Sequence, residues 1–469
     1  MTIYSVDFTA GHAATNGGKS TENVLRVLLI PDSIYWVTGT IARSIVKHNP
    51  WIKGTVISGA VLRRVVSQYP GLLEDIDLVH FTCSYASREW LPRLRDSLPC
   101  VTTHHHVSDW ELQKHNLDGD AIMTDSLQWA EDLEKRGVES SRIVCVPPGV
   151  DTNIFVPADE STRRRHRRHF GIAEDALVVG FFGKHSSNEF NRKGIDVFLS
   201  AIRQLQRQLP STTAFIVGPG WRDMVTELRN SGVNCIWLPY AEGHDELAKA
   251  YSTLDFYWVT ARVEGGPVTL LEAMSAGVCC ITTPVGLARE IVRSGENAIL
   301  VPMEQAESFA TQTLKLTRES DIRRNICADA RATILSEMDV SMTMKRVSGL
   351  YARAFEHFCR RTGRTAWVNV QLIAQEAQAP DDHSLEGLPL HAVPGTLQRK
   401  VRQWENLHWS ESLIRDHGQK REGLKLIRRT LVAHPLEGEI WRAYLRNELP
   451  SLISHPLGSL WQWSRKRRS

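Results

Sequence analysis

Two glutamates in one apolar stretch are the residues of this sequence best suited to chemistry. The stretch reads EGGPVTLLEAMSAGVCC over residues 264–280, and its carboxylates belong to Glu264 and Glu272. Apolar residues cover most of the helix circumference around Glu272, so the spacing predicts a buried helix. A carboxylate is rarely buried alone, because leaving water costs more than packing returns. We therefore expect Glu272 to meet a polar group, either on a ligand or in a structural salt bridge.

The turn before this helix suits an anionic or hydroxyl-rich ligand. Gly265 and Gly266 allow backbone amides to approach a ligand closely, and Pro267 is favoured at the first position of a helix. The positive end of the helix dipole then lies behind the turn. At a rise of about 1.5 Å per helical residue, Glu264 and Glu272 can contact two ends of one ligand about as long as a nucleotide-sugar. Ribose and glycan hydroxyls are natural partners for such carboxylates.

Two lysines form a second candidate set. Lys184 directly follows a predicted strand over 176–183, and Lys193 precedes Gly194 at the start of the next predicted helix. Cations at a strand end and a helix start suit a diphosphate, because lysine binds phosphate as a compact point charge. The alternative is that both are ordinary solvated lysines. Ligands of parallel α/β sheets bind beyond the carboxyl ends of the strands, which is where these lysines are predicted to lie.

Twelve short apolar runs are the elements that must position these residues. Six lie between residues 24 and 151, six lie between residues 176 and 302, and helix-like segments separate them. Runs rich in Val, Ile and Phe in this arrangement indicate buried parallel strands in β-α-β units. The sequence therefore predicts an α/β fold with two Rossmann-like, doubly wound parallel-sheet domains.

Composition shifts along the chain predict its domain organisation. Prolines and a break in periodicity place a hinge near residues 147–175, and a second loss of periodicity indicates a linker. The predicted units are a flexible N-terminus over 1–23, an N-terminal Rossmann-like domain over 24–160, a C-terminal Rossmann-like domain over 170–340, a helix over 341–360 that returns toward the first domain, a linker over 375–395, and a helical extension with a basic tail over 396–469.

The overall composition excludes several classes of protein. The 469 residues are 42% hydrophobic and 23% charged, and the net charge of +3 is too small to indicate a nucleic-acid partner. No apolar run reaches the roughly 18 residues of a membrane-spanning helix. Eight cysteines without C-x-x-C spacing favour reduced thiols in a cytoplasmic protein. The D-x-D-like segments at 75–77 and 118–120 are interpreted as turns, and no metal site is expected.

Four motifs, taken in order, resemble those of one enzyme family. They are VPPGVD (146–151), the GK…RKG arrangement (183–194), E-G-G-P-x-T-L-L-E-A-M-S-A-G (264–277), and T-P-V-G with E-I-V-x-x-G-E-N-A-I-L-V (283–301). In order and spacing they are similar to the retaining nucleotide-sugar glycosyltransferases of family 4. The resemblance covers about residues 24–360. It implies a GT-B fold, in which two Rossmann-like domains face each other across a cleft, and sugar transfer that needs no metal or other cofactor.

The resemblance also implies roles for particular residues. Glu272 would bind the donor ribose, Glu264 a hydroxyl of the transferred sugar, and the lysines the departing diphosphate. In the N-terminal half, Gly39 and Thr40 would approach the diphosphate and the acceptor, and a histidine of the run HHH (104–106) would be functional. The implied catalytic residues are Glu264, Lys193, Lys184 and His105, and the implied donor-binding residues are Glu272, Gly265, Gly266, Pro267, Val268, Gly39, Thr40 and His104.

Two departures from the family pattern leave parts of this assignment open. The family often has a large residue between the two glycines, whereas Gly266 and then Pro267 stand here, so the identity of the transferred sugar is open. The segment between Gly183 and Lys193 is longer than usual, which weakens the match at Lys184.

The expected partners are a nucleotide-sugar donor and a glycan or lipid-linked acceptor in cell-surface polysaccharide or glycolipid assembly. The basic run RRRHRRH (163–169) is interpreted as a solvated basic helix face, and the alternative is a role at a membrane surface or toward an acidic acceptor. The C-terminal LWQWSRKRRS is interpreted first as an ordinary terminus, with an interfacial membrane anchor as the alternative. The C-terminal helices could also dock a protein partner. The alternatives are a non-catalytic GT-B sugar-binding or scaffold subunit and a nucleotide-sugar epimerase.

Overall fold

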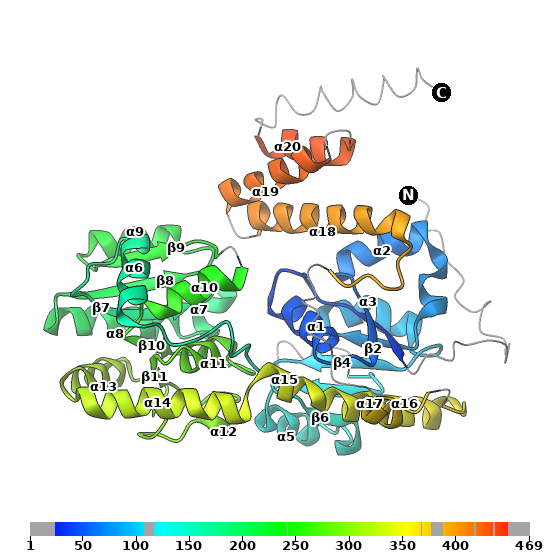
Figure 1. The fold of residues 1–469 in the computed structure, drawn as a ribbon, viewed down its shortest axis with the longest axis horizontal. Helices are drawn as coiled ribbons and strands as arrows, with labels where there is room; N and C mark the ends of the chain where they lie inside the picture. The colour runs from blue at the N-terminus through cyan, green and yellow to red at the C-terminus, as the bar shows by residue number, and fades with distance from the viewer. Residues whose placement is uncertain are drawn as a thin grey trace.

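Two parallel sheets lie side by side in the computed structural model, with helices packed around each (Figure 1). The structure describes residues 24–106, 117–241, 243–366, 368–376, 388–416, 419–434 and 437–448. The predicted flexible N-terminus and the basic tail from residue 449 onward lie outside the described residues. The predicted fold class, two doubly wound parallel-sheet domains followed by helices, is confirmed.

The N-terminal sheet has six parallel strands in the order β2-β1-β3-β4-β5-β6. Its strands are buried almost throughout, as expected for a parallel sheet covered on both faces. The strands are β1 Leu25–Leu29, β2 Ile52–Val56, β3 Leu78–Phe81, β4 Cys100–His104, β5 Ala121–Thr124 and β6 Ile143–Cys145. The described helices between them are α1 Val37–Lys47, α2 Gly59–Gln68, α3 Ser84–Leu94 and α5 Leu127–Lys135.

The C-terminal sheet also has six strands, in the order β12-β11-β10-β7-β8-β9. The strands are β7 Leu177–Phe182, β8 Thr212–Val217, β9 Cys235–Leu238, β10 Phe256–Val259, β11 Cys279–Thr282 and β12 Ile299–Leu300. The helices are α6 Glu160–Phe170, α7 Ser187–Arg192, α8 Ile195–Gln208, α9 Arg222–Asn230, α10 Gly243–Ser252, α11 Val268–Ser275, α12 Ala288–Ile291, α13 Ala306–Arg318 and α14 Ser320–Glu337. Helix α11, which carries Glu272, packs against β10, β11 and α14.

The chain crosses between the two domains at two neighbouring points. Val150, on the first crossing, donates its amide to the Met338 carbonyl at 2.9 Å and accepts from the Val340 amide at 2.9 Å. After the second crossing come α15 Val340–Thr343 and α16 Val347–Thr362. Helix α16 packs its buried face, which includes Leu350 and Tyr351, into the core of the N-terminal domain. The two crossings are therefore hydrogen-bonded to each other.

The basic helix α6 is only partly solvated. Asp159 caps its start by accepting from the Thr162 amide at 2.7 Å. Arg163 and Arg167 turn inward and donate to the two oxygens of Asp255, at 2.6 and 2.8 Å, and Arg167 is buried. The interpretation of the whole run as a solvated face is therefore wrong for these two arginines, which attach α6 to the start of β10.

The C-terminal helices are attached to the N-terminal domain. They are α17 Val370–Glu376, α18 Gly395–Arg415, α19 Lys420–Ala433 and α20 Gly438–Glu448. Before α18, the Pro389 carbonyl accepts from the Val56 amide at 2.8 Å, and Leu390 packs into the core around α2. From α18, the buried Glu405 accepts from the Ser58 amide at the start of α2 at 2.7 Å. The extension is thus continuous with the N-terminal core.

Trp409 of α18 contacts both Rossmann-like domains. Its ring stacks on Tyr35 with 5.7 Å between centroids and meets Trp36 edge-on at 5.3 Å, both in the loop before α1. It also lies 6.2 Å from the ring of Tyr240, which follows β9 in the C-terminal domain. Figure 1 shows α18 lying across the N-terminal domain, with one end directed toward β9 and α10. A single buried side chain therefore joins the extension to both domains.

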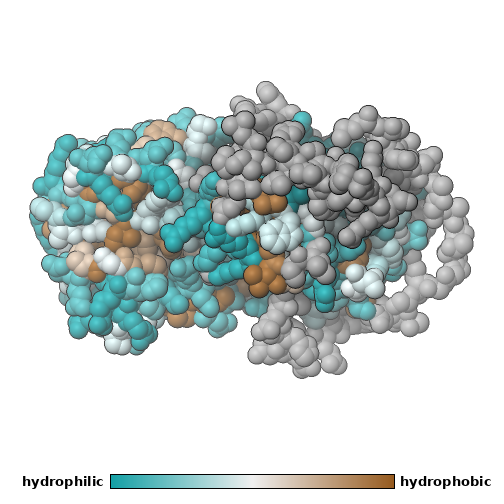
Figure 2. All heavy atoms as spheres, turned by 90° about the horizontal axis from the view of Figure 1, so that it is seen from above, coloured by the Kyte–Doolittle hydropathy of each residue, from teal (hydrophilic) through white to brown (hydrophobic). Residues whose placement is uncertain are grey.

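The described surface gives no sign of a membrane-spanning segment. In the part of the chain that the structure describes, no helix is both long and apolar enough to cross a bilayer. Seen from above, the described part of the surface is mostly hydrophilic, and its hydrophobic residues occur in small groups (Figure 2).

We expect Trp409→Ala to lower the free energy of unfolding by about 3–5 kcal/mol, because it removes a fully buried indole and leaves a cavity. Urea unfolding followed by circular dichroism measures this change. Val432→Ala is the matched control, since Val432 on α19 is 83% exposed and should change the free energy by less than about 0.5 kcal/mol. If the two substitutions change the free energy of unfolding equally, the burial of Trp409 at this junction is contradicted.

Candidate active site

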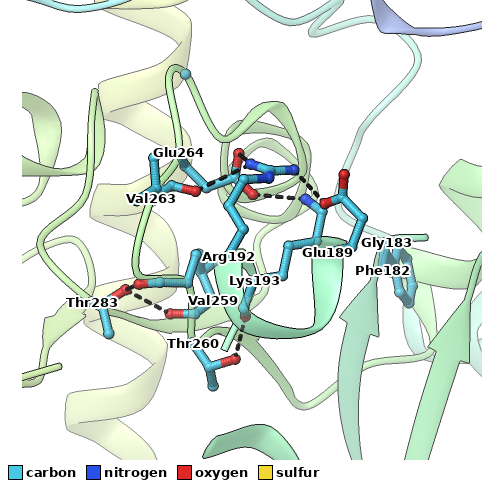
Figure 3. A network of polar contacts seen from close by, with 12 residues as sticks. Phe182, Gly183, Glu189, Arg192, Lys193, Val259, Thr260, Val263, Glu264 and Thr283 are labelled. Atoms are coloured by element: carbon cyan, nitrogen blue, oxygen red, sulfur yellow. Dashed lines mark hydrogen bonds and ion pairs between the residues drawn. The ribbon is translucent and has the colours of Figure 1, made fainter. Parts of the chain in front are cut away.

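Glu264 is held by two cations at the carboxyl edge of the C-terminal sheet (Figure 3). Its Oε1 lies 2.7 Å from Lys193 Nζ and its Oε2 lies 3.0 Å from Arg192 Nη1, and its side chain is only 15% exposed. Burial alone would raise the pKa of Glu264, but the charges of Arg192 and Lys193 outweigh burial and hold the pKa well below its usual range. Glu264 is therefore an ionised carboxylate throughout the physiological range.

The turn at the end of α7 fixes these two cations. Gly194 adopts φ of 59°, and a Cβ at this position would lie 2.0 Å from the Thr260 carbonyl oxygen. The Thr260 hydroxyl donates to the carbonyls of Lys193 and Gly194, at 3.0 and 2.9 Å. Arg192 is bound further by Glu189, with 2.5 Å between Nη2 and Oε2. Only glycine fits where the turn meets the end of β10, so the turn and β10 together determine where the cations point.

The Gly265–Gly266 turn lies against the N-terminal domain. A Cβ on Gly265 would lie 1.6 Å from the His105 carbonyl oxygen, and a Cβ on Gly266 would lie 2.8 Å from Pro148 Cδ. The Gly266 amide donates to Asp125 Oδ2 at 3.2 Å. Both glycines are therefore required by close contact between the two domains, in addition to any contact with a ligand.

His105 follows β4 and lies in this contact. Its Nδ1 is 2.9 Å from Asp125 Oδ2 and its Nε2 is 3.0 Å from the Thr82 carbonyl oxygen. Burial alone would lower the pKa of His105, but Asp125 and the bond to Thr82 raise it to about 9. Both ring nitrogens then donate, and His105 is an imidazolium at neutral pH. His104 is fully buried within β4, whereas the His105 carbonyl and, through Asp125, the His105 ring contact the glycine turn. The charge of His106 also helps to lower the pKa of Glu264, so two histidines of the run lie near this turn.

Glu272 is buried, as the sequence predicts, and its polar partner in this structure is a tyrosine. The Tyr251 hydroxyl on α10 donates to Glu272 Oε2 at 2.7 Å, and Glu272 is 7% exposed. Burial raises the pKa of Glu272 to about 7, although the Tyr251 bond lowers it. Helix α11 begins at Val268, with Pro267 as its N-cap, which places Glu272 in its second turn.

The other predicted residues lie near strand ends. Lys184 follows β7 and is half-buried, in the loop that leads to α7. Gly39 and Thr40 lie in the first turn of α1, where a Cβ on Gly39 would lie 2.5 Å from the backbone of Ile34. Thr40 accepts a hydrogen bond from Arg43 at 3.2 Å. The structure thus brings Glu264, Lys193, His105 and both glycines together. Among the described residues, no hydrogen bond or ion pair joins Lys184, Gly39 or Thr40 to that group.

Sequence reasoning missed three residues of this site, namely Arg192, Asp125 and Tyr251. Arg192 stands beside Lys193 in the RKG motif, and Asp125 stands near the carboxyl end of the predicted strand over 121–126. Both positions could therefore have been recognised from the sequence. Tyr251 carried none, because its meeting with Glu272 depends on how α10 packs against α11.

The D-x-D-like segments have structural partners. Asp77 binds Arg26 through both carboxylate oxygens, and Asp120 binds Arg361 and the Cys100 amide. In the described ranges, no group of three or more His, Cys, Asp or Glu side chains could hold a metal ion.

Solved structures share the fold. The Anabaena protein HepE in complex with UDP-glucose matches with a TM-score of 0.58 and 18% identity, over 69% of this chain and 98% of that one. Sucrose-phosphate synthase from Thermosynechococcus elongatus matches with a TM-score of 0.58 and 15% identity, over 71% of this chain and 99% of that one. With two facing Rossmann-like sheets and a charged site between them, the chain is a GT-B protein.

Two family models match the chain. One, described as Glycosyltransferase Family 4, matches residues 30–154, and the other, described as Glycosyl transferases group 1, matches residues 176–319. Together they cover more than half of the sequence. The chain belongs to glycosyltransferase family 4, which confirms the resemblance of the four motifs.

Curated relatives are glycosyltransferases. A D-inositol 3-phosphate glycosyltransferase of Stackebrandtia nassauensis is 25% identical, over 58% of this chain and 67% of its own length. A D-inositol 3-phosphate glycosyltransferase of Actinosynnema mirum is 28% identical, over 58% of this chain and 71% of its own length. A third relative, from Mycolicibacterium smegmatis, is a GDP-mannose-dependent alpha-(1-6)-phosphatidylinositol monomannoside mannosyltransferase. It is 25% identical, over 45% of this chain and 58% of its own length.

We expect Glu272→Gln to stabilise the free protein at high pH. The folded-state pKa of Glu272 is raised from 4.5 to about 7, so folding favours the protonated form and the wild type loses stability as pH rises from 4.5 through 7. A shift of this size corresponds to about 3 kcal/mol above pH 7. Urea unfolding at pH 5 and pH 8 measures the effect. The free energy of unfolding of the variant, relative to that of the wild type, should be higher at pH 8 than at pH 5. If the two proteins differ in free energy of unfolding by the same amount at both pH values, the raised pKa of Glu272 is contradicted.

Proposed function

We propose that this glycosyltransferase moves a sugar from a nucleotide-diphosphate-sugar to a glycan or lipid-linked acceptor, with the anomeric configuration retained. The observation that carries the proposal is the ionised Glu264 held by Arg192 and Lys193 beside the glycine turn. Glu272 then receives the donor ribose, and Glu264 receives a hydroxyl of the transferred sugar. Gly265, Gly266, Pro267 and Val268 line the sugar and the diphosphate.

Leaving-group stabilisation supplies the proposed catalysis. An arriving diphosphate shares Lys193 and Arg192 with Glu264, and it brings the negative charge that these cations stabilise as the bond to the sugar breaks. Lys184, in the adjoining loop, adds a further cation. The departing diphosphate accepts the proton of the acceptor hydroxyl, so no side chain needs to act as base. Gly39, Thr40 and His105 face the donor from the N-terminal domain, and no metal takes part.

The acceptor is proposed by analogy with the relatives. Their names include D-inositol 3-phosphate and phosphatidylinositol monomannoside, which are polyhydroxylated compounds that carry phosphate. We infer a glycan or lipid-linked acceptor for this chain, used in cell-surface glycan assembly at the inner face of a membrane. The exposed arginines of α6, Arg164, Arg165 and Arg168, supply positive charge for such a surface.

Donor binding is the first test. We expect calorimetry with UDP-, GDP- and ADP-sugars, in the presence of EDTA, to show binding of one nucleotide series. Glu272→Ala should weaken that binding tenfold or more, about 1.4 kcal/mol, because the ribose loses its carboxylate. Glu337→Ala, at an exposed position of α14, is the control. No binding of any series by the wild type would favour the non-catalytic scaffold subunit.

We expect Lys193→Met to lower kcat by about 10²–10³-fold, because the developing charge on the diphosphate loses a preorganised cation. Lys315→Met, at an exposed position of α13, should leave kcat unchanged. Initial rates of nucleotide release measure both variants. Equal rates for wild type and Lys193→Met would remove Lys193 from the mechanism.

Retention is tested separately by proton NMR of the first product formed. We expect the anomeric coupling constant of the product to match that of the donor. If the first product instead shows the coupling constant of the opposite anomer, the retaining mechanism is overturned, whereas the proposed donor site is unaffected.

A further inference from the structure

Asp125 links the two domains at the candidate active site. It directly follows β5, and its side chain is only 4% exposed. One oxygen, Oδ2, accepts from His105 Nδ1 at 2.9 Å and from the Gly266 amide at 3.2 Å. A single carboxylate oxygen thus joins the end of β4 in one domain to the glycine turn of the other.

The second oxygen of Asp125 is buried at the same place. Among the described residues, Oδ1 has no hydrogen-bond partner. A buried, unpartnered carboxylate oxygen loses its water without compensation, so it is costly unless a ligand completes it. The turn that Asp125 touches begins with Glu264, which we propose to hold a hydroxyl of the sugar. An ionised carboxylate oxygen only accepts hydrogen bonds, and a sugar hydroxyl has an O–H group to donate.

We propose that Asp125 is a positioning residue that holds His105 as an imidazolium against the glycine turn, and that its free oxygen accepts a hydroxyl of the transferred sugar. This inference rests on the proposed function for its ligand, but the pairing with His105 stands on its own. With both ring nitrogens donating, His105 has no lone pair with which to act as a base. It supplies instead a fixed positive charge on the N-terminal side of the glycine turn.

The charge on His105 depends on groups from several elements. Asp125 contributes from the end of β5, and Thr82 contributes through its carbonyl after β3. The other titratable groups around this pair are Asp32, His80, His106, Glu264 and Cys145. Asp125 alone contacts the ring with a carboxylate oxygen among the bonds that the structure gives His105.

Asp125→Asn tests the positioning part, because the amide keeps the shape and removes the charge. Two-bond nitrogen–proton NMR of the imidazole at pH 8 should show His105 protonated on both nitrogens in the wild type and neutral in the variant. Asp132→Asn, on the surface of α5, is the matched control and should leave the signal unchanged. A doubly protonated His105 in Asp125→Asn would overturn the positioning role.

The sugar contact is tested by comparing two ligands in calorimetry: the free nucleoside diphosphate and the nucleotide-sugar of the series that binds. We expect Asp125→Asn to keep the affinity for the nucleoside diphosphate within about twofold and to weaken the nucleotide-sugar by about tenfold. Equal losses for both ligands, or none, would overturn the contact with the sugar.

The two proposals fail in different ways. A wild type that binds no nucleotide would overturn the proposed function and the sugar contact with it, whereas the imidazole signal would still decide whether Asp125 holds His105. A wild type that binds, with Asp125→Asn unchanged in both measurements, would overturn only the role of Asp125. Thermal unfolding of the variant confirms that either result comes from a folded protein.

Discussion

The interaction on which the site depends is the ion pair of Glu264 with Arg192 and Lys193. Each partner would be costly to bury alone, and together they remain charged in a place from which water is largely excluded. The pair also joins two separate loops, since Arg192 and Lys193 end α7 whereas Glu264 follows β10. Removing Glu264 would take the carboxylate partner from Lys193 and leave Arg192 with Glu189 alone, so the glutamate has a structural role in addition to the one proposed for it in the reaction. A diphosphate that enters this place meets cations that are already oriented.

A second charged pair lies on the other side of the domain boundary. His105 and Asp125 belong to the N-terminal domain, and the Gly266 amide of the C-terminal domain completes their network. Because the two glycines allow contact between backbones, both charged pairs lie against one turn. The site is therefore assembled only when the domains are together, and separation of the domains would break the bond between Gly266 and Asp125. This couples the formation of the site to the relative position of the domains.

The fold and the C-terminal half of the site were predictable from the sequence, because parallel strands and their carboxyl ends leave strong local patterns. Glu264 and Lys193 stand at strand or helix ends that periodicity locates, and Glu272 is the one carboxylate of an otherwise apolar helix. The partners of these residues were not predictable. Tyr251 reaches Glu272 through helix packing, and Asp125 reaches Gly266 across the domain boundary, so neither contact leaves a pattern along the chain. The inward orientation of Arg163 and Arg167 was not predictable for the same reason. A run of arginines predicts a solvated helix face, and only the folded structure shows that Asp255 lies within reach of these two.

Trp409 limits how the two domains can move. The hydrogen-bonded crossings at Val150 and Val340 join the domains along one side of the molecule, and α18 lies on the opposite side (Figure 1). Two domains joined only along one line can still rotate about that line. A second contact between the domains, away from the line, opposes that rotation. Separation of the domains must therefore break the contact between Trp409 and Tyr240 or displace α18 from Tyr35. An aromatic pair contributes only about 0.5–1.5 kcal/mol beyond its buried area. The contact between Trp409 and Tyr240 therefore adds only a small free energy to the attachment between the two domains.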